Sequence, residues 1–302
     1  MSYTASAELK TIVVATDLSQ TSSAALHYAR LLATAYGARV VLAHVVDPVS
    51  YANLSDVPQQ VLEEMTDTAR GEMDRLAAEF LSAGIPSNSE VRQGVVTQLL
   101  LQVIEQYKAD LVVLGTRGAK GVGPVVVGTV AEQLVRLAPC PVMAVASDVV
   151  RTGADALTGG EILVPVERNA ASHKAIAAAK LLASRLGGGV LMLHARTADE
   201  ALAHIDPCAE AAELFPEDSA RSKVHTRCLV KDGDASDVIA AVAAEYAVSL
   251  IVVGVNRESR SKTSHGTAYE VVARARTPVL FIPPQPEIVE EKIPSQGAVV
   301  AC

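Results

Sequence analysis

The residues with the clearest potential for chemistry lie in one glycine-rich segment between Gly115 and Thr129. Its sequence, GTRGAKGVGPVVVGT, places three glycines and a threonine in the spacing Gly-x2-Gly-x9-Gly-Thr. Glycine lets a backbone approach a ligand closely, and the N–H groups at the start of a helix attract anions. The Thr129 hydroxyl can cap that helix or contact a phosphate oxygen, while Arg117 and Lys120 can neutralise phosphate charge. The segment therefore predicts a phosphate-binding loop.

The elements around this loop predict an open α/β sheet. An apolar run at Leu111–Leu114 indicates a strand buried on both faces, and a helix is expected to begin at Thr129. Similar runs at Thr11–Thr16 and Val142–Ala146 alternate with helical patterns such as Thr97–Tyr107. This alternation favours a doubly wound parallel sheet, in which ligands bind beyond the carboxyl ends of the strands.

The whole pattern occurs twice along the chain. Ile12–Asp17 resembles Ile162–Glu167 at an offset of 150 residues, whereas Asp110–Gly115 resembles Ser249–Gly254 at an offset of 139. The difference, 150 − 139 = 11, predicts an insertion in the first copy between His44 and Gly94. We therefore expect two tandem domains. Their expected boundaries are 1–148 and 161–284, with a linker at 149–160 and a C-terminal tail at 285–302.

With these motifs the chain resembles the universal stress protein family, in particular its ATP-binding members. The resemblance rests on the glycine spacing, on Asp17 shortly before Ser19, and on the His44-Val45 pair after the second strand. It covers nearly the whole chain as two copies. It implies two five-stranded, Rossmann-like domains of the adenine nucleotide α-hydrolase-like type, with ATP as the ligand and Mg²⁺ as an optional companion.

The resemblance also implies which residues touch the nucleotide. Ala15, Thr16 and Asp17 would line the adenosine side, with Val45 near the adenine. Gly115 and Gly118 would meet the ribose and phosphates. The phosphate chain would bind at Gly128, Thr129 and Val130.

The second copy departs from this pattern. Arg257 stands in place of the second glycine, only eight residues separate it from Gly266, and Glu167 replaces Asp17. An arginine side chain would occupy space that a glycine leaves for the ligand. We therefore expect a degenerate motif in the second domain.

Composition limits the remaining functional classes. The formal net charge is −8 and no basic tract occurs, which argues against a nucleic-acid partner. No apolar run approaches the length of a membrane span, and no signal-peptide pattern opens the chain. The four cysteines are too scattered to imply a disulfide framework or a zinc site. A cytoplasmic protein is expected.

Several other residues have simple structural explanations. His44 and His194 lie on apolar strands and are expected to be core histidines, and the charged stretch Glu63–Arg75 is expected to face solvent. The chain has no P-loop, no Gly-x-Gly-x-x-Gly fingerprint, no zincin motif and no Gly-x-Ser-x-Gly elbow.

These observations predict an ATP-binding regulatory switch or sensor that is not an enzyme, because only Asp17 is placed to assist phosphoryl transfer. Two alternatives stay open: a nucleotide-free interaction scaffold, and a slow ATP-hydrolysing enzyme on the same fold. The expected partners are an adenine nucleotide and an unknown regulatory protein. The two halves are expected to form an internal pseudo-dimer through Val142–Ala146 and Val279–Ile282, and two chains could associate as a homodimer.

Overall fold

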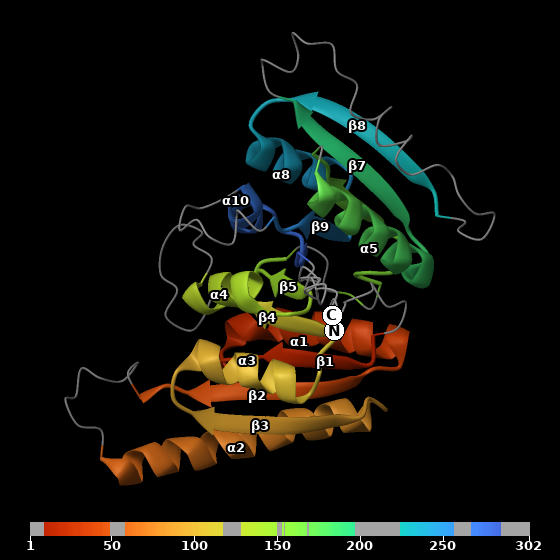
Figure 1. The fold of residues 1–302 in the computed structure, drawn as a ribbon. Helices are drawn as coiled ribbons and strands as arrows, with labels where there is room; N and C mark the ends of the chain where they lie inside the picture. Colours follow the sequence, from red (N-terminus) through yellow and green to blue (C-terminus); the bar gives the residue numbers. More distant parts are fainter. Residues whose placement is uncertain are drawn as a thin grey trace, which may run out of the picture.

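A computed structural model describes residues 9–48, 58–116, 128–149, 153, 155–167, 169–196, 224–256 and 267–284. In this part of the chain ten strands form one sheet, in the order β3-β2-β1-β4-β5-β10-β9-β6-β7-β8 (Figure 1). Neighbouring strands are parallel within each half, and β5 pairs with β10 in the antiparallel direction. The predicted class, two tandem five-stranded α/β domains, is confirmed.

The elements of the first half follow the strand–helix alternation of the sequence. They are β1 (Thr11–Ala15), the 3-10 turn η1 (Gln20–Ser22), α1 (Ser23–Tyr36), β2 (Arg39–Val46), α2 (Gln59–Ser82), β3 (Ser87–Gln93), α3 (Val96–Gln106), β4 (Leu111–Gly115), α4 (Thr129–Leu137) and β5 (Val142–Val145).

The second half repeats this order as far as the structure describes it. Its elements are β6 (Glu161–Pro165), α5 (Ala170–Leu186), β7 (Gly189–Arg196), β8 (Thr226–Asp232), α8 (Ala235–Glu245), β9 (Leu250–Gly254), α10 (Thr267–Arg274) and β10 (Val279–Ile282). Between β2 and β3 the chain is 11 residues longer than between β7 and β8, because the strand offset changes from 150 to 139 there. The insertion lies where the offsets predicted it, in the segment that includes α2.

Local signals explain three helix ends. Gly37 and Gly187 end α1 and α5 in the left-handed conformation, with φ of 66° and 74°, as glycine does readily. Asn169 caps α5, because its side chain accepts a hydrogen bond from the Ser172 N–H. α1 has no side-chain cap: its N-cap residue, Ser22, makes no cap bond, and its hydroxyl donates to the Ser19 carbonyl at 2.7 Å.

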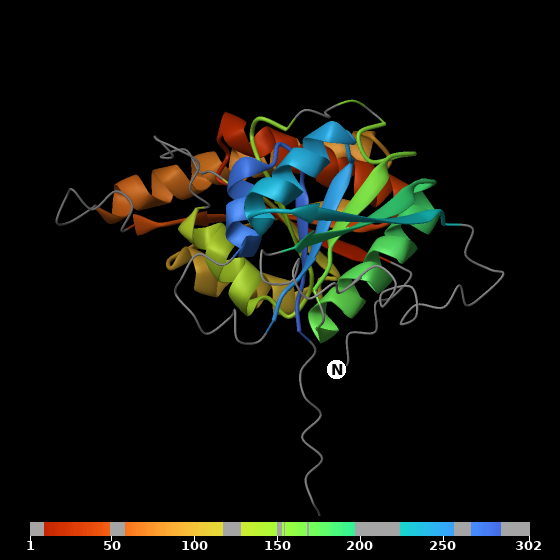
Figure 2. The same ribbon diagram turned by 90° about the horizontal axis from the view of Figure 1, so that it is seen from above.

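The two halves join along their last strands. β5 and β10 pair in the register Val279–Ala144, Leu280–Met143 and Phe281–Val142, so the predicted internal pairing is present. Helices add contacts across the join, since Arg185 Nε donates to the Ala35 carbonyl at 2.9 Å. Seen from above, the strands turn progressively along the sheet, which is the usual right-handed twist (Figure 2).

The core forms two apolar layers, one on each face of the sheet, and both layers run through both halves. The strands contribute alternate residues to both layers; α1, α2 and α5 pack in one layer, and α3, α4, α8 and α10 pack in the other. Ala156 and Leu157 are also fully buried, so the segment expected to be a linker contributes to the shared core. The expected tail at 285–302 lies outside the described residues.

Two cysteines show different environments. Cys140 is a buried free thiol, and burial with the nearby charge of Asp110 raises its pKa to about 12. Cys228, on β8, is disulfide-bonded, which the scattered cysteine spacing did not predict. In the described part of the chain, no helix combines the length and apolar character needed to cross a bilayer.

Candidate functional site

The carboxyl ends of β1, β2 and β4 meet at one edge of the first half and border a cavity of about 860 Å³, here called the strand-end cavity. The arrowhead of β3 and the start of α2 lie on this same side, at the left of Figure 1. Eight of the nine predicted site residues line the cavity; the ninth, Gly118, lies outside the described residues. The eight are Ala15, Thr16, Asp17, Val45, Gly115, Gly128, Thr129 and Val130.

A tight turn after β1 orients Asp17. The backbone N–H and the hydroxyl of Ser19 both donate to Asp17 Oδ1, at 3.1 and 2.6 Å. Leu18 takes a positive φ of 61°, and its N–H donates to Thr16 Oγ1 at 3.1 Å. Asp17 is exposed, so its carboxylate stands at the mouth of the cavity in a set direction.

The helix α4 begins at the cavity, and its N-terminus has no side-chain cap. Its N-cap residue is Gly128, and the hydroxyl of the exposed Thr129 makes no hydrogen bond with any described residue. Gly128 is held by its N–H, which donates to the Thr116 carbonyl at 2.8 Å, and a Cβ there would lie 3.2 Å from that oxygen. The free N–H groups of the first helical turn and the helix dipole suit an anion.

The wall facing α3 and α4 is apolar. Val45 points to this side of the sheet, because alternate residues of a strand face opposite ways. Leu100, Leu114 and Ala131 complete the wall and are buried. Such a surface can bury the flat face of a heterocyclic base.

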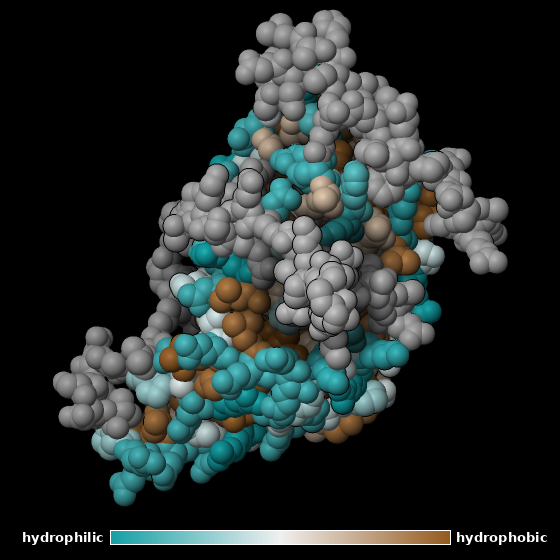
Figure 3. All heavy atoms as spheres, viewed as in Figure 1, coloured by the Kyte–Doolittle hydropathy of each residue, from teal (hydrophilic) through white to brown (hydrophobic). Residues whose placement is uncertain are grey.

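The opposite wall comes from α2 and was missed by sequence reasoning. Six of its residues line the cavity: Val61, Glu64, Met65, Thr68, Ala69 and Glu72. The charged stretch of α2 does face solvent, as predicted, and its surface is hydrophilic at the bottom of Figure 3. One stripe of the same helix nevertheless borders the cavity. The spacing of Met65, Ala69 and Glu72 by four and three residues is the signal that could have revealed it.

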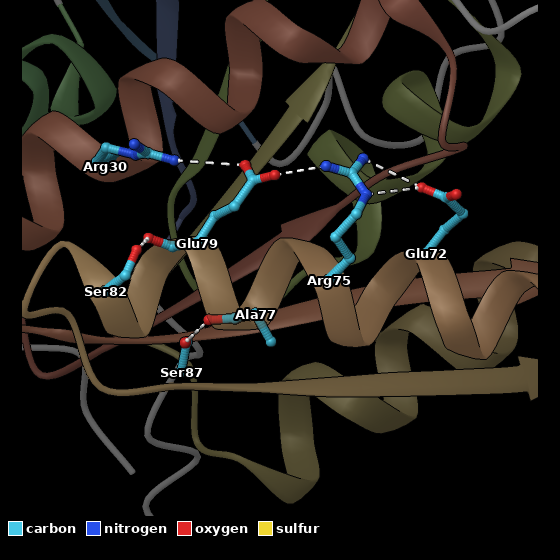
Figure 4. Close-up of polar contacts among 7 residues, drawn as sticks. All are labelled: Arg30, Glu72, Arg75, Ala77, Glu79, Ser82 and Ser87. Atoms are coloured by element: carbon cyan, nitrogen blue, oxygen red, sulfur yellow. Dashed lines mark hydrogen bonds and ion pairs between the residues drawn. The ribbon is translucent and has the colours of Figure 1, made fainter.

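Ion pairs on α2 hold its charged side chains in place (Figure 4). Arg75 pairs with Glu72 at 3.1 Å and with Glu79 at 2.5 Å, and Glu79 reaches Arg30 of α1 at 4.0 Å. These pairs are exposed, so each contributes little to stability. They do fix where the Glu72 carboxylate lies beside the cavity.

The charged groups around the cavity are carboxylates: Asp17, Asp47, Glu64 and Glu72. No lysine or arginine lines it among the described residues, and the two cationic candidates, Arg117 and Lys120, lie outside them. The described residues also hold no cluster of three or more His, Cys, Asp or Glu able to bind a metal. Among the described groups, the N-terminus of α4 is therefore the feature best suited to an anion.

His44 also lines the cavity, although its apolar strand predicted a core position. Its Nδ1 lies 2.9 Å from the Thr16 carbonyl oxygen, which ties β2 to the end of β1. The ring is only half-buried.

In the second half, Gly254 and Glu167 take the positions of Gly115 and Asp17. A Cβ on Gly254 would lie 2.1 Å from the Ala171 carbonyl oxygen, so this glycine allows α5 to pack against β9. Glu167 accepts a hydrogen bond from the Asn169 side chain at 2.9 Å. Arg257 and Gly266 lie outside the described residues.

Comparisons with known proteins agree with this architecture. The model of the universal stress protein family matches twice, at residues 8–146 and 160–283. A universal stress protein of Methanocaldococcus jannaschii is 31% identical over 141 residues, which cover 45% of this chain and 81% of that protein. One of Thermus aquaticus is 33% identical over 138 residues, covering 45% of this chain and 98% of that protein.

A solved structure shares the two-domain fold. The universal stress protein of Archaeoglobus fulgidus superimposes with a TM-score of 0.73 at 17% identity, covering 93% of this chain and 99% of that one. The two family matches together span most of the chain. The chain therefore belongs to the universal stress protein family, as a member with two tandem domains.

Proposed function

We propose that the first domain binds ATP in the strand-end cavity and that the protein acts as a nucleotide-dependent switch with little or no turnover. The observation that carries this proposal is the convergence of the predicted residues on one cavity that ends at the uncapped N-terminus of α4. A cavity of about 860 Å³ falls in the range of small-molecule sites.

The described residues fit the parts of the nucleotide. The apolar wall beside Val45 suits the adenine, and the first turn of α4 suits a phosphate. Asp17 would accept a ribose hydroxyl, or would supply an oxygen to Mg²⁺ carried in with the nucleotide. The surrounding carboxylates favour entry of the triphosphate with its charge partly neutralised by such a cation.

Little catalysis is expected from this set of groups. Efficient phosphoryl transfer needs an oriented nucleophile, metal ligands and cationic stabilisation of the developing charge. The described lining offers carboxylates and hydroxyls and no lysine or arginine. Bound ATP would instead favour the arrangement of the site that binds it best, which is what a switch requires.

Calorimetric titration with ATP and Mg²⁺ tests the binding. We expect one binding event in the natural chain and its loss in Gly118→Arg, because an arginine there would fill the phosphate space. Gly71→Arg is the matched control: Gly71 lies on the exposed side of α2 with open space around it, so the same side chain should leave ATP affinity unchanged. No ATP binding by the natural chain would favour the nucleotide-free scaffold.

Steady-state hydrolysis separates the switch from an enzyme. We expect a rate well below about 1 s⁻¹, the lower end for typical enzymes. A faster rate that disappears in both Asp17→Ala and Gly118→Arg would instead establish the hydrolase alternative, because a contaminant would not respond to these substitutions.

A further inference from the structure

We propose that His44 is a further ligand-binding residue of the strand-end cavity, with its Nε2 accepting a hydrogen bond from a hydroxyl or amino group of the nucleoside. The inference rests on the proposed function and adds a residue that the glycine motif does not include. It follows from the hydrogen bonding of the ring, its exposure to the cavity, and a comparison with the second half.

The tautomer of His44 is set by its partner. A carbonyl oxygen can only accept a hydrogen bond, so the 2.9 Å contact with the Thr16 carbonyl requires a proton on Nδ1. In the neutral ring Nε2 is then the acceptor. The contact also fixes the plane of the ring beside the end of β1.

No described protein group donates to Nε2 of His44, whose only recorded hydrogen bond is the one from Nδ1. The ring is half-buried and lines the cavity, so part of its hydration is already lost. An acceptor in this position gains from a ligand donor, because leaving it unpaired costs free energy once the ligand excludes water.

His194 in the second half occupies the position equivalent to His44 and can be compared with it. His194 makes the same Nδ1 contact, at 3.0 Å from the Val166 carbonyl oxygen. It is buried, and it does not line the strand-end cavity. The Nδ1 bond is therefore a feature of both repeats that joins two strands, whereas the open Nε2 of His44 belongs to the first half.

The carboxylates around the cavity indicate which part of the ligand His44 would contact. Asp17, Asp47, Glu64 and Glu72 also face the cavity, and each is an acceptor when ionised. The phosphate position lies at the N-terminus of α4. The side near His44 and α2 therefore favours the donor-rich nucleoside, with its ribose hydroxyls and amino group.

Two isosteric substitutions separate the two ring nitrogens. His44→Asn keeps a donor near the Nδ1 position and removes Nε2, whereas His44→Gln keeps a polar group near Nε2 and removes the donor to Thr16. The binding of ATP, 2′-deoxy-ATP, 3′-deoxy-ATP and inosine triphosphate is measured for both variants and the natural chain. His194→Asn and His194→Gln are the matched controls.

One of the three analogues lacks the group that donates to His44 Nε2. We expect the natural chain to bind that analogue about 2- to 12-fold more weakly than ATP, the range of one net hydrogen bond. His44→Asn should lose a similar factor for ATP and no longer distinguish that analogue, with an unchanged Tm. His44→Gln should keep the discrimination and unfold at a lower Tm. The His194 variants should change Tm only.

The inference is overturned if His44→Asn binds ATP and all three analogues as the natural chain does, or if the natural chain does not distinguish the analogues from ATP. Both results leave the proposed function standing. If the natural chain binds no ATP at all, the proposed function fails first and this inference fails with it. His44→Asn decides the question alone if His44→Gln does not fold.

Discussion

At the scale of single residues, each half ends its fourth strand with a glycine, Gly115 or Gly254. Gly115 ends β4 and lines the strand-end cavity. Gly254 ends β9 in the equivalent position, where a Cβ would lie 2.1 Å from the Ala171 carbonyl oxygen and 2.9 Å from the Ala171 Cβ. At Gly254 the absence of a side chain thus permits close helix–strand packing.

Substitution of Gly254 by alanine tests this packing role. We expect Gly254→Ala to lower the free energy of unfolding by about 1–3 kcal/mol, because backbone and Cβ must shift to admit the methyl group. Urea denaturation measures the change, and ATP affinity should stay the same because Gly254 does not line the strand-end cavity.

Gly71→Ala is the matched control for that measurement. Gly71 lies within α2, and a Cβ there meets nothing within 4 Å. Alanine should therefore raise the free energy of unfolding by about 0.5–1 kcal/mol through helix propensity. If Gly254→Ala raised the free energy of unfolding as Gly71→Ala is expected to do, close contact would not explain the glycine at 254.

At the scale of elements, the two halves have strands of equal length but connections of different length. Corresponding strands have equal lengths in both halves, and the offset changes only between β2 and β3, between α3 and α4, and near β5. The longer connection contains α2, which forms one wall of the strand-end cavity. In the first half, part of the cavity wall therefore comes from a connection and not from the common sheet.

Unequal binding by the two halves follows from these connections. We expect at most one tight ATP per chain, because Arg257 replaces the second glycine and the second motif is one residue short. Native mass spectrometry with increasing ATP measures the stoichiometry. Two sites of equal affinity per chain would refute the expectation.

At the scale of the whole molecule, the join between β5 and β10 covers the apolar edge of both domains. All four residues of each strand are buried. The remaining edges are β3 and β8, which are only partly buried and carry charged residues such as Arg92 and Lys231. Charged edge strands resist further pairing, whereas an exposed apolar edge invites it.

Separating the halves should therefore create a dimer. A fragment of residues Met1–Val150 exposes β5, and we expect it to pair with a second copy in the antiparallel direction that β10 adopts. Light scattering at tens of micromolar measures its mass, with circular dichroism to confirm that it is folded. A folded fragment that stays strictly monomeric would show that covalent linkage is needed for the pairing.

Much of this protein is determined by local sequence. The apolar runs predict β1, β4 and β5 within a few residues, and the repeat offsets extend the pattern to the second half, because these signals are local. Eight predicted site residues reach one cavity for a related reason: parallel strands bring their carboxyl ends to the same edge of a sheet.

Tertiary structure decided the features that depend on distant partners. Exposure of His44 to the cavity and burial of His194 cannot be read from two similar apolar strands, because burial depends on what packs against each strand end. The same holds for the α2 wall, the hydroxyl of Ser22 that does not cap its helix, and the buried Leu157 of the expected linker. Packing between elements far apart in the chain fixes these environments. Periodicity can mark the inward stripe of α2, but it does not show what that stripe faces.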